Sequence, residues 1–229
     1  MDFELTDDQE SLQEGMRAFL DGRFSLDTVR TIEASGHLDR DRWHELGETG
    51  VFSLTLPEAD GGLELGISEA TLVFEELGRA LVPGPLVATF LAAPWVDGAG
   101  TGDAIVGLYE PAEPVSVVEH QPDLDALLTI GGDGVRRLDP ATIATTPTRR
   151  PVDALTPVWV VDGAVPPGEL VADADAAARA RLVGIVLTSA LQLGVALRAT
   201  SARTSMSAHR CLTAWNEPIT RPNCSRSLA

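Results

Sequence analysis

Cysteine and histidine are the side chains of this 229-residue chain best suited to binding a metal ion, but their spacing argues against such a site. The two cysteines, Cys211 and Cys224, form neither the paired spacing of a zinc site nor a disulfide framework. The four histidines are scattered along the chain, at His37, His44, His120 and His209. The sequence therefore predicts no metal centre.

A glycine-rich stretch, "GGDG" at residues 131–134, is the one segment that looks like a phosphate-binding loop. Such loops bind phosphate where a helix begins, and no helix is expected after this stretch. Asp133-Gly134 instead lies between the β-rich runs "LLTI" and "VRRL", which is a strong hairpin signal. The chain also lacks a Gly-x-Ser-x-Gly elbow, a Walker loop and a His-Glu-x-x-His motif. We therefore interpret "GGDG" as a hairpin turn.

The composition is that of a globular protein, with 44% hydrophobic residues and enough length to bury a substantial core. All 17 basic residues are arginine, and the net charge of −17 argues against nucleic acid or a membrane as a partner. No run approaches the roughly 20 uninterrupted apolar residues that span a bilayer. The opening "MDFELTDDQE" lacks the regions of a signal peptide. We therefore expect a cytoplasmic protein.

The first hundred residues have the apolar spacing of helices. Thr6 and Gln9 form a capping box at the start of a helix that we expect over about residues 7–21. A second short helix carries Val29, and a third begins near Asp39. The run "LVATFLAAPWV" is apolar nearly all round, so it is expected to be a helix buried between others.

The strongest helical pattern of this region begins after a loop that contains Pro57 and two glycines. Ser68 is expected to cap this helix. Its buried stripe is expected to consist of Leu72, Val73, Leu77 and Leu81. Its solvent-facing side is expected to carry Glu75, Glu76 and Arg79.

Short β-rich runs separated by proline and glycine follow, and they predict a small antiparallel β domain over residues 103–172. One long helix is expected over residues 173–200. Its apolar face is expected to carry Leu182, Ile185, Val186, Ser189, Leu193 and Leu197. The predicted fold class is therefore α+β: an all-α helical domain over residues 1–102, the β domain, and the first helix of an incomplete C-terminal helical domain.

This order of elements, together with three segments, resembles the acyl-CoA dehydrogenase family over residues 1–200. The segment "MDFELTDDQESLQEGMRAFL" is similar to the family's first helix, and "LPEADGGLELGISEATLVFEELGRAL" to its characteristic loop and following helix. The segment "ALQLGVALRAT" is similar to the first helix of its C-terminal domain. The resemblance implies a flavin-dependent oxidoreductase that acts in lipid metabolism, for example in fatty acid β-oxidation. In that family FAD accepts a hydride from the β-carbon of an acyl thioester, and a glutamate removes the α-proton.

The resemblance also implies where a flavin would be contacted. In the family a Leu-Thr-Glu-Pro stretch in the β domain forms one wall of the flavin site, and here the matching stretch is "LYEP". The candidate cofactor-binding residues are therefore Leu108, Tyr109 and Glu110. Tyr109 replaces the flavin-facing threonine, and the glycines that normally follow are missing. The family's tryptophan segment is also missing, so we assign Trp159 a structural role.

Beyond residue 200 the family pattern stops. The catalytic glutamate and the Arg-x-x-Phe-Gly-Arg run of the family are missing, so no residue is assigned as catalytic. We back-translated a segment typical of the family's C-terminal helix region into GC-rich codons. The reverse complement of that DNA, translated in a shifted reading frame, gives the amino-acid sequence of residues 208–229. We therefore interpret residues 201–229 as a non-family, disordered tail of antisense origin, in which Cys211, Trp215 and Cys224 need no function.

Two hypotheses follow for the function. The first is an acyl-CoA dehydrogenase-like flavin oxidoreductase that is inactive as this truncated chain and binds FAD weakly or not at all. The alternative is a non-catalytic partner subunit of a mixed tetramer, because the β domain looks like that of divergent actinobacterial subunits. The implied partners are an acyl-CoA substrate and either further copies of the chain or a regular dehydrogenase subunit. A third hypothesis, an unrelated binding module, has no sequence feature in its favour.

Overall fold

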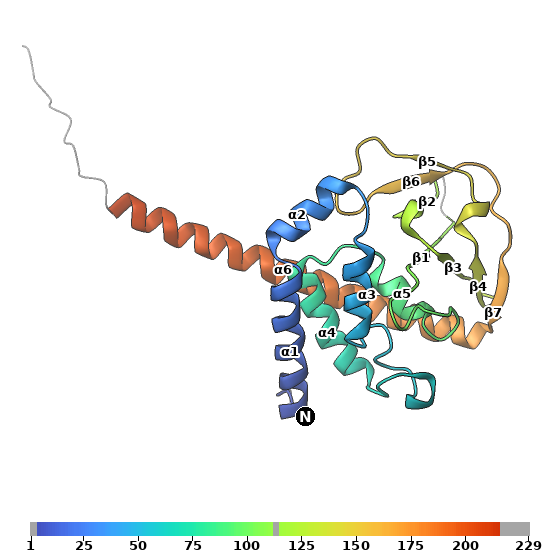
Figure 1. Cartoon of the computed structure of the whole chain (residues 1–229), viewed down its shortest axis with the longest axis horizontal. Coiled ribbons are helices and arrows are strands. Elements are labelled where there is room, and N and C mark those ends of the chain that lie inside the picture. Colours follow the sequence, from blue (N-terminus) through green and yellow to red (C-terminus); the bar gives the residue numbers. More distant parts are fainter. Residues whose placement is uncertain (1–3, 112–114, 216–229) are drawn as a thin grey trace, which may run out of the picture.

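The computed structural model describes residues 4–111 and 115–215, with the backbone alone from residue 202 onward. Figure 1 shows a body of helices, a small β region beside it, and a final long helix, α6, that runs behind α4 and continues beyond the body. Helices, two small sheets and a last helix follow one another along the chain. The predicted α+β fold class is thereby confirmed.

The N-terminal region forms the predicted helices. They are α1 (Asp7–Arg23), α2 (Leu26–Ser35), α3 (Arg40–Glu48), α4 (Ile67–Ala80) and α5 (Leu86–Ala92). The predicted capping box is confirmed: the Gln9 backbone N–H donates to the Thr6 hydroxyl over 3.3 Å, and the Thr6 N–H donates to Oε1 of Gln9 over 3.2 Å. The run after Pro85 forms α5, and its side chains are largely buried, as its composition predicts.

The start of α4 differs from the prediction. Ser68 lies inside the first turn, and Gly66 is the N-cap. The Glu69 carboxylate accepts the Gly66 backbone N–H over 3.0 Å and the side-chain amide of Gln9 over 2.7 Å. The cap is therefore supplied by Glu69, which faces the helix start and also connects α4 to α1. Serine type alone does not reveal this, because the cap is made by a glutamate three residues after a glycine.

Glu76 was expected on the solvent side of α4, and this expectation is wrong. Its side chain is 1% exposed. Two Arg17 donors from α1 reach its carboxylate over 2.5 and 3.1 Å, and Nε of Arg79 reaches it over 2.5 Å. Burial raises the pKa of Glu76, but the hydrogen bonds and charges of the two arginines outweigh it and lower that pKa. Two arginines thus compensate the buried carboxylate.

The middle region forms two small sheets. The strands are β1 (Val106–Leu108), β2 (Val117–Glu119), β3 (Ala126–Ile130), β4 (Val135–Leu138), β5 (Thr145–Pro147), β6 (Val158–Val161) and β7 (Glu169–Ala172). The sheets have the orders β1-β3-β4-β7 and β2-β6-β5. The predicted hairpin is confirmed, since β3 and β4 pair antiparallel and the Gly131 N–H donates to the Gly134 carbonyl over 2.9 Å.

One pairing departs from the antiparallel prediction: β1 pairs with β3 in parallel, with Val106 opposite Ala126. Alternating apolar residues predict that a segment is a strand, but they do not say which neighbour it pairs with or in which direction. The parallel pairing arises because the chain crosses through β2 and a short helical turn before it returns as β3. It places the ends of β1 and β3 at the same edge of the sheet.

The last helix, α6 (Ala174–Trp215), extends past the expected end at residue 200. Residues 216–229 lie outside the described residues, so disorder in that part of the tail stays a prediction. α6 packs along α4 at two glycines: a Cβ on Gly78 would overlap the Leu191 carbonyl oxygen, and a Cβ on Gly194 would overlap that of Glu75. Glycine at both positions therefore lets the two helix backbones approach closely.

The opposite face of α6 is apolar and exposed. The exposed fractions reach 66% at Leu182 and 64% at Ile185, and the face also includes Val186, Leu193 and Leu197. By length and composition the stretch Ala174–Ser201 is apolar enough to cross a membrane. The mean hydropathy of its most apolar 18 residues is 1.7, and 22% of these residues are buried. The criterion of about 20 uninterrupted apolar residues does not detect this stretch. Its packing against α4 shows that it is part of the folded body.

Candidate functional site

The three candidate cofactor residues lie together where β1 ends. Leu108 is the last residue of β1 and is half-buried. The Tyr109 N–H continues the sheet by donating to the Leu128 carbonyl over 2.8 Å, and its side chain is 7% exposed in the hydrophobic core. Glu110 is exposed. The chain therefore leaves the core at Glu110, with all three residues at one edge of the sheet.

Two adjoining cavities open at this edge, and we call them together the β1–α6 groove. Their volumes are about 500 Å³ and about 460 Å³. Glu110, Ile130 and Arg181 line both cavities. The larger is also lined by Tyr109, and the smaller by Leu108, so the structure brings all three candidate residues to the groove. The smaller cavity is also lined by the apolar side chains of Val87, Leu91, Leu108 and Ile185, and we call this part of its lining the apolar arm.

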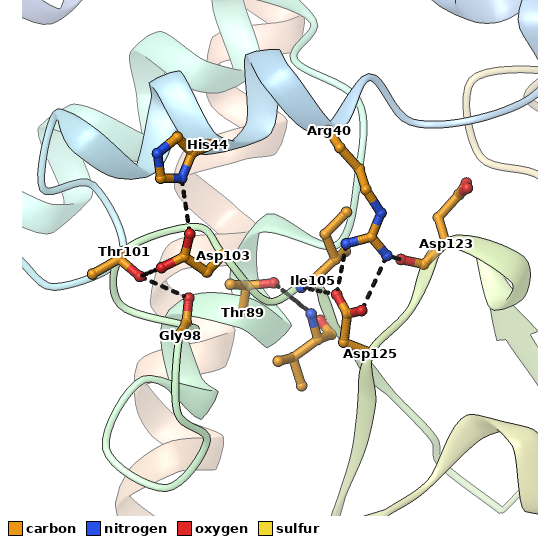
Figure 2. Close-up of polar contacts among 10 residues, drawn as sticks. Arg40, His44, Thr89, Gly98, Thr101, Asp103, Ile105, Asp123 and Asp125 are labelled. Carbon is orange, nitrogen blue, oxygen red and sulfur yellow. Dashed lines mark hydrogen bonds and ion pairs between the residues drawn. The ribbon is translucent and has the colours of Figure 1, made fainter.

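The start of β1 is fixed by the helical domain, as Figure 2 shows. The hydroxyl of Thr89, on α5, donates to the Val106 carbonyl over 3.1 Å and accepts the Val106 N–H over 3.0 Å. Thr89 is completely buried. Because both backbone groups of Val106 are bound by one side chain, α5 sets the position from which β1 runs to the groove.

A second set of contacts holds the same strand from α3. The Asp125 carboxylate accepts the Ile105 N–H over 2.8 Å and also binds Arg40 over 3.0 and 3.1 Å (Figure 2). Arg40 donates further to the Asp123 carbonyl over 2.7 Å. Nearby, Nδ1 of His44 lies 3.2 Å from the Asp103 carboxylate. The strand β1, which leads to the groove, is therefore held at its start by contacts with α3 and α5 of the N-terminal domain.

Arg181 is a groove residue that the sequence analysis missed. It lies on α6, and its guanidinium donates to the Ile130 carbonyl at the end of β3. Arginine on a helix is ordinarily read as a solvated residue, and no sequence signal shows that this one meets a strand end. The sequence does show that no charged residue occurs from Leu182 to Leu197. Arg181 is the last charged residue before this uncharged stretch.

The groove does not provide the dry carboxylate that removal of a carbon-bound proton requires. Among its described lining residues Glu110 is the carboxylate, and Glu110 is exposed. The Ser189 hydroxyl also lines the groove, but it donates to the Ile185 carbonyl within the helix. What the arrangement offers is an apolar arm, one arginine and one exposed carboxylate, which suit binding more than acid–base chemistry.

The groove also fits a tightly held flavin poorly. Tyr109 borders it, but the ring belongs to the hydrophobic core, whereas the family motif has a smaller hydroxyl side chain at this position. Trp159 lies elsewhere, on β6 of the second sheet, opposite Val118 and Pro147. It is half-buried and does not line the groove. The assignment of Leu108, Tyr109 and Glu110 to a cofactor stays a prediction.

The remaining sequence candidates are placed as follows. Nδ1 of His37 lies 3.1 Å from the Asp123 carboxylate, and His120 is 2% exposed. His209 and Cys211 lie on the part of α6 whose side chains are not described, and Cys224 lies outside the described residues. Within the described part of the chain, no group of three or more His, Cys, Asp or Glu side chains is arranged to hold a metal ion.

Residues 6–104 match the family model described as acyl-CoA dehydrogenase, N-terminal domain. Residues 6–104 therefore form an acyl-CoA dehydrogenase N-terminal domain, and the resemblance of this part of the chain to the family is confirmed.

Two curated relatives agree with this assignment. The chain is 29% identical over 153 residues to acyl-CoA dehydrogenase IpdE2 of Mycolicibacterium smegmatis, which covers 63% of this chain and 49% of that protein. It is 30% identical over 115 residues to benzylmalonyl-CoA dehydrogenase of Aromatoleum aromaticum, covering 49% of this chain and 30% of that protein. The chain thus spans about half the length of the curated relatives it matches, or less.

Solved structures show the same fold over nearly the whole chain. A steroid ACAD variant of Tcur3481-Tcur3483 gives a TM-score of 0.70 at 20% identity, covering 94% of this chain and 69% of that one. The ChsE4-ChsE5 complex from Mycobacterium tuberculosis gives 0.68 at 22% identity, covering 97% and 71%. PigA with FAD and proline gives 0.69 at 16% identity, covering 90% and 69%. The helices, sheets and α6 therefore correspond to about 70% of the length of these solved chains.

Proposed function

We propose that the chain supplies the N-terminal and middle domains of an acyl-CoA dehydrogenase-like flavin oxidoreductase, which catalyses α,β-dehydrogenation of an acyl-CoA thioester. The observation that carries this proposal is the β1–α6 groove. Its apolar arm, formed by α5, β1 and α6, suits an acyl chain. The residues that match the family's flavin wall, Leu108 to Glu110, stand at its edge.

The reaction sets requirements that these residues do not meet alone. The α-proton of a thioester is weakly acidic, so its removal needs a base in a water-excluded pocket and hydrogen bonds that polarise the carbonyl. FAD, the family cofactor, supplies the hydride acceptor when it is bound. The chain's own residues bind and orient an acyl group, and the exposed Glu110 is not a buried base. We therefore propose that this chain by itself is inactive and binds FAD weakly or not at all.

The direct test is to purify the 229-residue chain with added FAD and record its absorbance. We expect far less than one flavin per chain and no reduction of an artificial electron acceptor with acyl-CoA thioesters. Thioester binding is measured separately by calorimetry, and we expect weak binding of a neutral acyl-CoA. A stoichiometric flavin spectrum or measurable turnover would contradict inactivity of this chain, and absence of any thioester binding would contradict the acyl-CoA assignment itself.

A second candidate function is a non-catalytic partner subunit in a mixed tetramer with a regular dehydrogenase. Two observations favour it: the altered position Tyr109 packs into the core, and one solved relative is, by its name, a ChsE4-ChsE5 complex. Co-expression with a regular dehydrogenase encoded nearby distinguishes the two. A partner subunit would co-purify in a complex with fewer flavins than subunits. A homotetramer with one flavin per chain would exclude this role.

A further inference from the structure

Among the residues that the structure describes, Arg181 has no carboxylate partner, in contrast to two other arginines of the chain. Arg40 pairs with Asp125 and Arg137 with Glu169. Within the described part of the chain, no acidic side chain lies within ion-pair distance of Arg181, although the chain has twice as many acidic as basic residues (34 against 17). An unpaired arginine in so acidic a protein is available for an anion from outside.

The guanidinium of Arg181 is also held in place. It donates to the Ile130 carbonyl, which uses one of its five N–H donors and fixes it at the end of β3. A group held in this way loses less conformational entropy on binding an anion than a free surface arginine does. Arg181 therefore combines a fixed position with unused donors.

The surroundings of Arg181 indicate what kind of anion it would bind. It lines the cavity whose apolar arm is formed by Val87, Leu91, Leu108 and Ile185. A ligand that fills this arm and reaches Arg181 needs an apolar body with an anionic oxygen group attached to that body. Glu110 lines the same groove, and its negative charge disfavours an anion on its own side, so the favourable position is at Arg181.

We propose that Arg181 binds a carboxylate carried by the acyl group, so that the groove prefers carboxyacyl thioesters to neutral acyl thioesters. This inference rests on the proposed function, and it adds a substrate class to it. The phosphates of coenzyme A are the other source of anionic oxygen. The acyl carboxylate is preferred because Arg181 borders the apolar arm itself, and coenzyme A phosphates are separated from the acyl group by the long pantetheine chain.

The test compares two thioesters of equal chain length, hexanoyl-CoA and adipoyl-CoA, which differ in the terminal carboxylate. Their binding to the full chain is measured by isothermal titration calorimetry. Because hydrogen bonds to charged groups are the strong ones, we expect adipoyl-CoA to bind at least about tenfold more tightly. Arg181→Gln should remove this preference, so that the two thioesters bind with equal affinity. The matched control is Arg179→Gln, an exposed arginine on the same helix that does not line the groove, and it should keep the preference.

Arg181→Lys provides a second variant in case the glutamine variant fails to fold, and it should keep part of the preference because it keeps the charge. Equal binding of the two thioesters by the unmodified chain would overturn the inference alone. An equal loss of both thioesters in Arg181→Gln would assign Arg181 to a coenzyme A phosphate and would also overturn it. If neither thioester binds, the proposed function fails and this inference fails with it.

Discussion

The N-terminal helical domain and the middle β domain are held together in different ways. In the helical domain a fully buried carboxylate, Glu76, is shared by Arg17 and Arg79, and this joins α1 to α4 in the interior. In the β domain the strands are short, and every residue of β6 in the second sheet is only half-buried. The family model covers the first region and stops where the second begins.

This difference fits the match of the family model to the helical region alone. Residues 6–104 contain the buried contacts on which the helical packing depends, so substitutions there are costly. At the edge of the β domain Glu110 is exposed, whereas its neighbour Tyr109 is buried. At that edge Tyr109 has been absorbed into the core without disturbing the pairing of β1 with β3.

Removal of the buried carboxylate is expected to have the largest effect. Glu76→Ala leaves Arg17 and Arg79 facing each other without their shared partner, so we expect a loss of about 3–5 kcal/mol in the free energy of unfolding. Urea denaturation measures it. Glu14→Ala, an exposed glutamate on α1, is the control and should change stability by less than about 0.5 kcal/mol. Equal effects of the two variants would show that the cluster does not stabilise the helical domain.

The contact between α4 and α6 should be the next most sensitive. In Gly194→Ala the new Cβ would overlap the backbone carbonyl of Glu75, so α6 must move, and we expect a loss of about 1–3 kcal/mol. Gly15→Ala is the matched control, because a Cβ at this helical glycine on α1 meets nothing within 4 Å. That variant should stabilise the chain by about 0.5–1 kcal/mol. Thermal unfolding followed by circular dichroism measures both, and a neutral Gly194→Ala would refute the close approach.

The junction between the two domains should be of intermediate sensitivity. Thr89→Val keeps the shape of the side chain but leaves both backbone groups of Val106 without their partner, which we expect to cost about 1–3 kcal/mol. Thr31→Val, whose hydroxyl only bonds an exposed helix carbonyl, is the control. Amide hydrogen exchange at Val106 should accelerate in Thr89→Val and remain unchanged in the control. Unchanged exchange in both would show that Thr89 does not hold β1.

The smallest effect concerns pH and the β domain. Burial lowers the pKa of His120 from 6.5, against the charges of Asp123 and Asp153. The stability that depends on neutral His120 is therefore fully present above about pH 6.5. It is lost as the pH falls toward the lowered value, because the unfolded chain binds a proton that the folded chain refuses. Unfolding free energy measured from about pH 7 to about pH 5 should fall less in His120→Gln than in the unmodified chain. Identical slopes would contradict this.

Local signals in the sequence predict much of the fold. The Thr6 and Gln9 capping box and the Asp133-Gly134 hairpin depend on residues close in sequence, and both appear as predicted. The apolar period gives α1 to α5, and it also gives the exposed stripe of α6 that includes Leu182. These features can be predicted because their physical causes act over three or four residues.

Features that depend on distant partners could not be predicted in this way. Glu76 carries a charge, which places it on the solvent side of a helical pattern, and its burial depends on Arg17 from another helix. The parallel pairing of β1 depends on the path of the chain between the strands. Arg181 reaches the groove because α6 passes the end of β3 at Ile130, a contact that no residue spacing reveals.

The long α6 also sets how the molecule moves in solution. A 42-residue helix is about 63 Å long at about 1.5 Å per residue, whereas a compact chain of this length has a radius of gyration of about 17 Å. Figure 1 shows the helix continuing well past the body. The chain will therefore tumble as an elongated rotor. Amide N–H vectors parallel to the axis of α6 will report a longer rotational correlation time than those perpendicular to it.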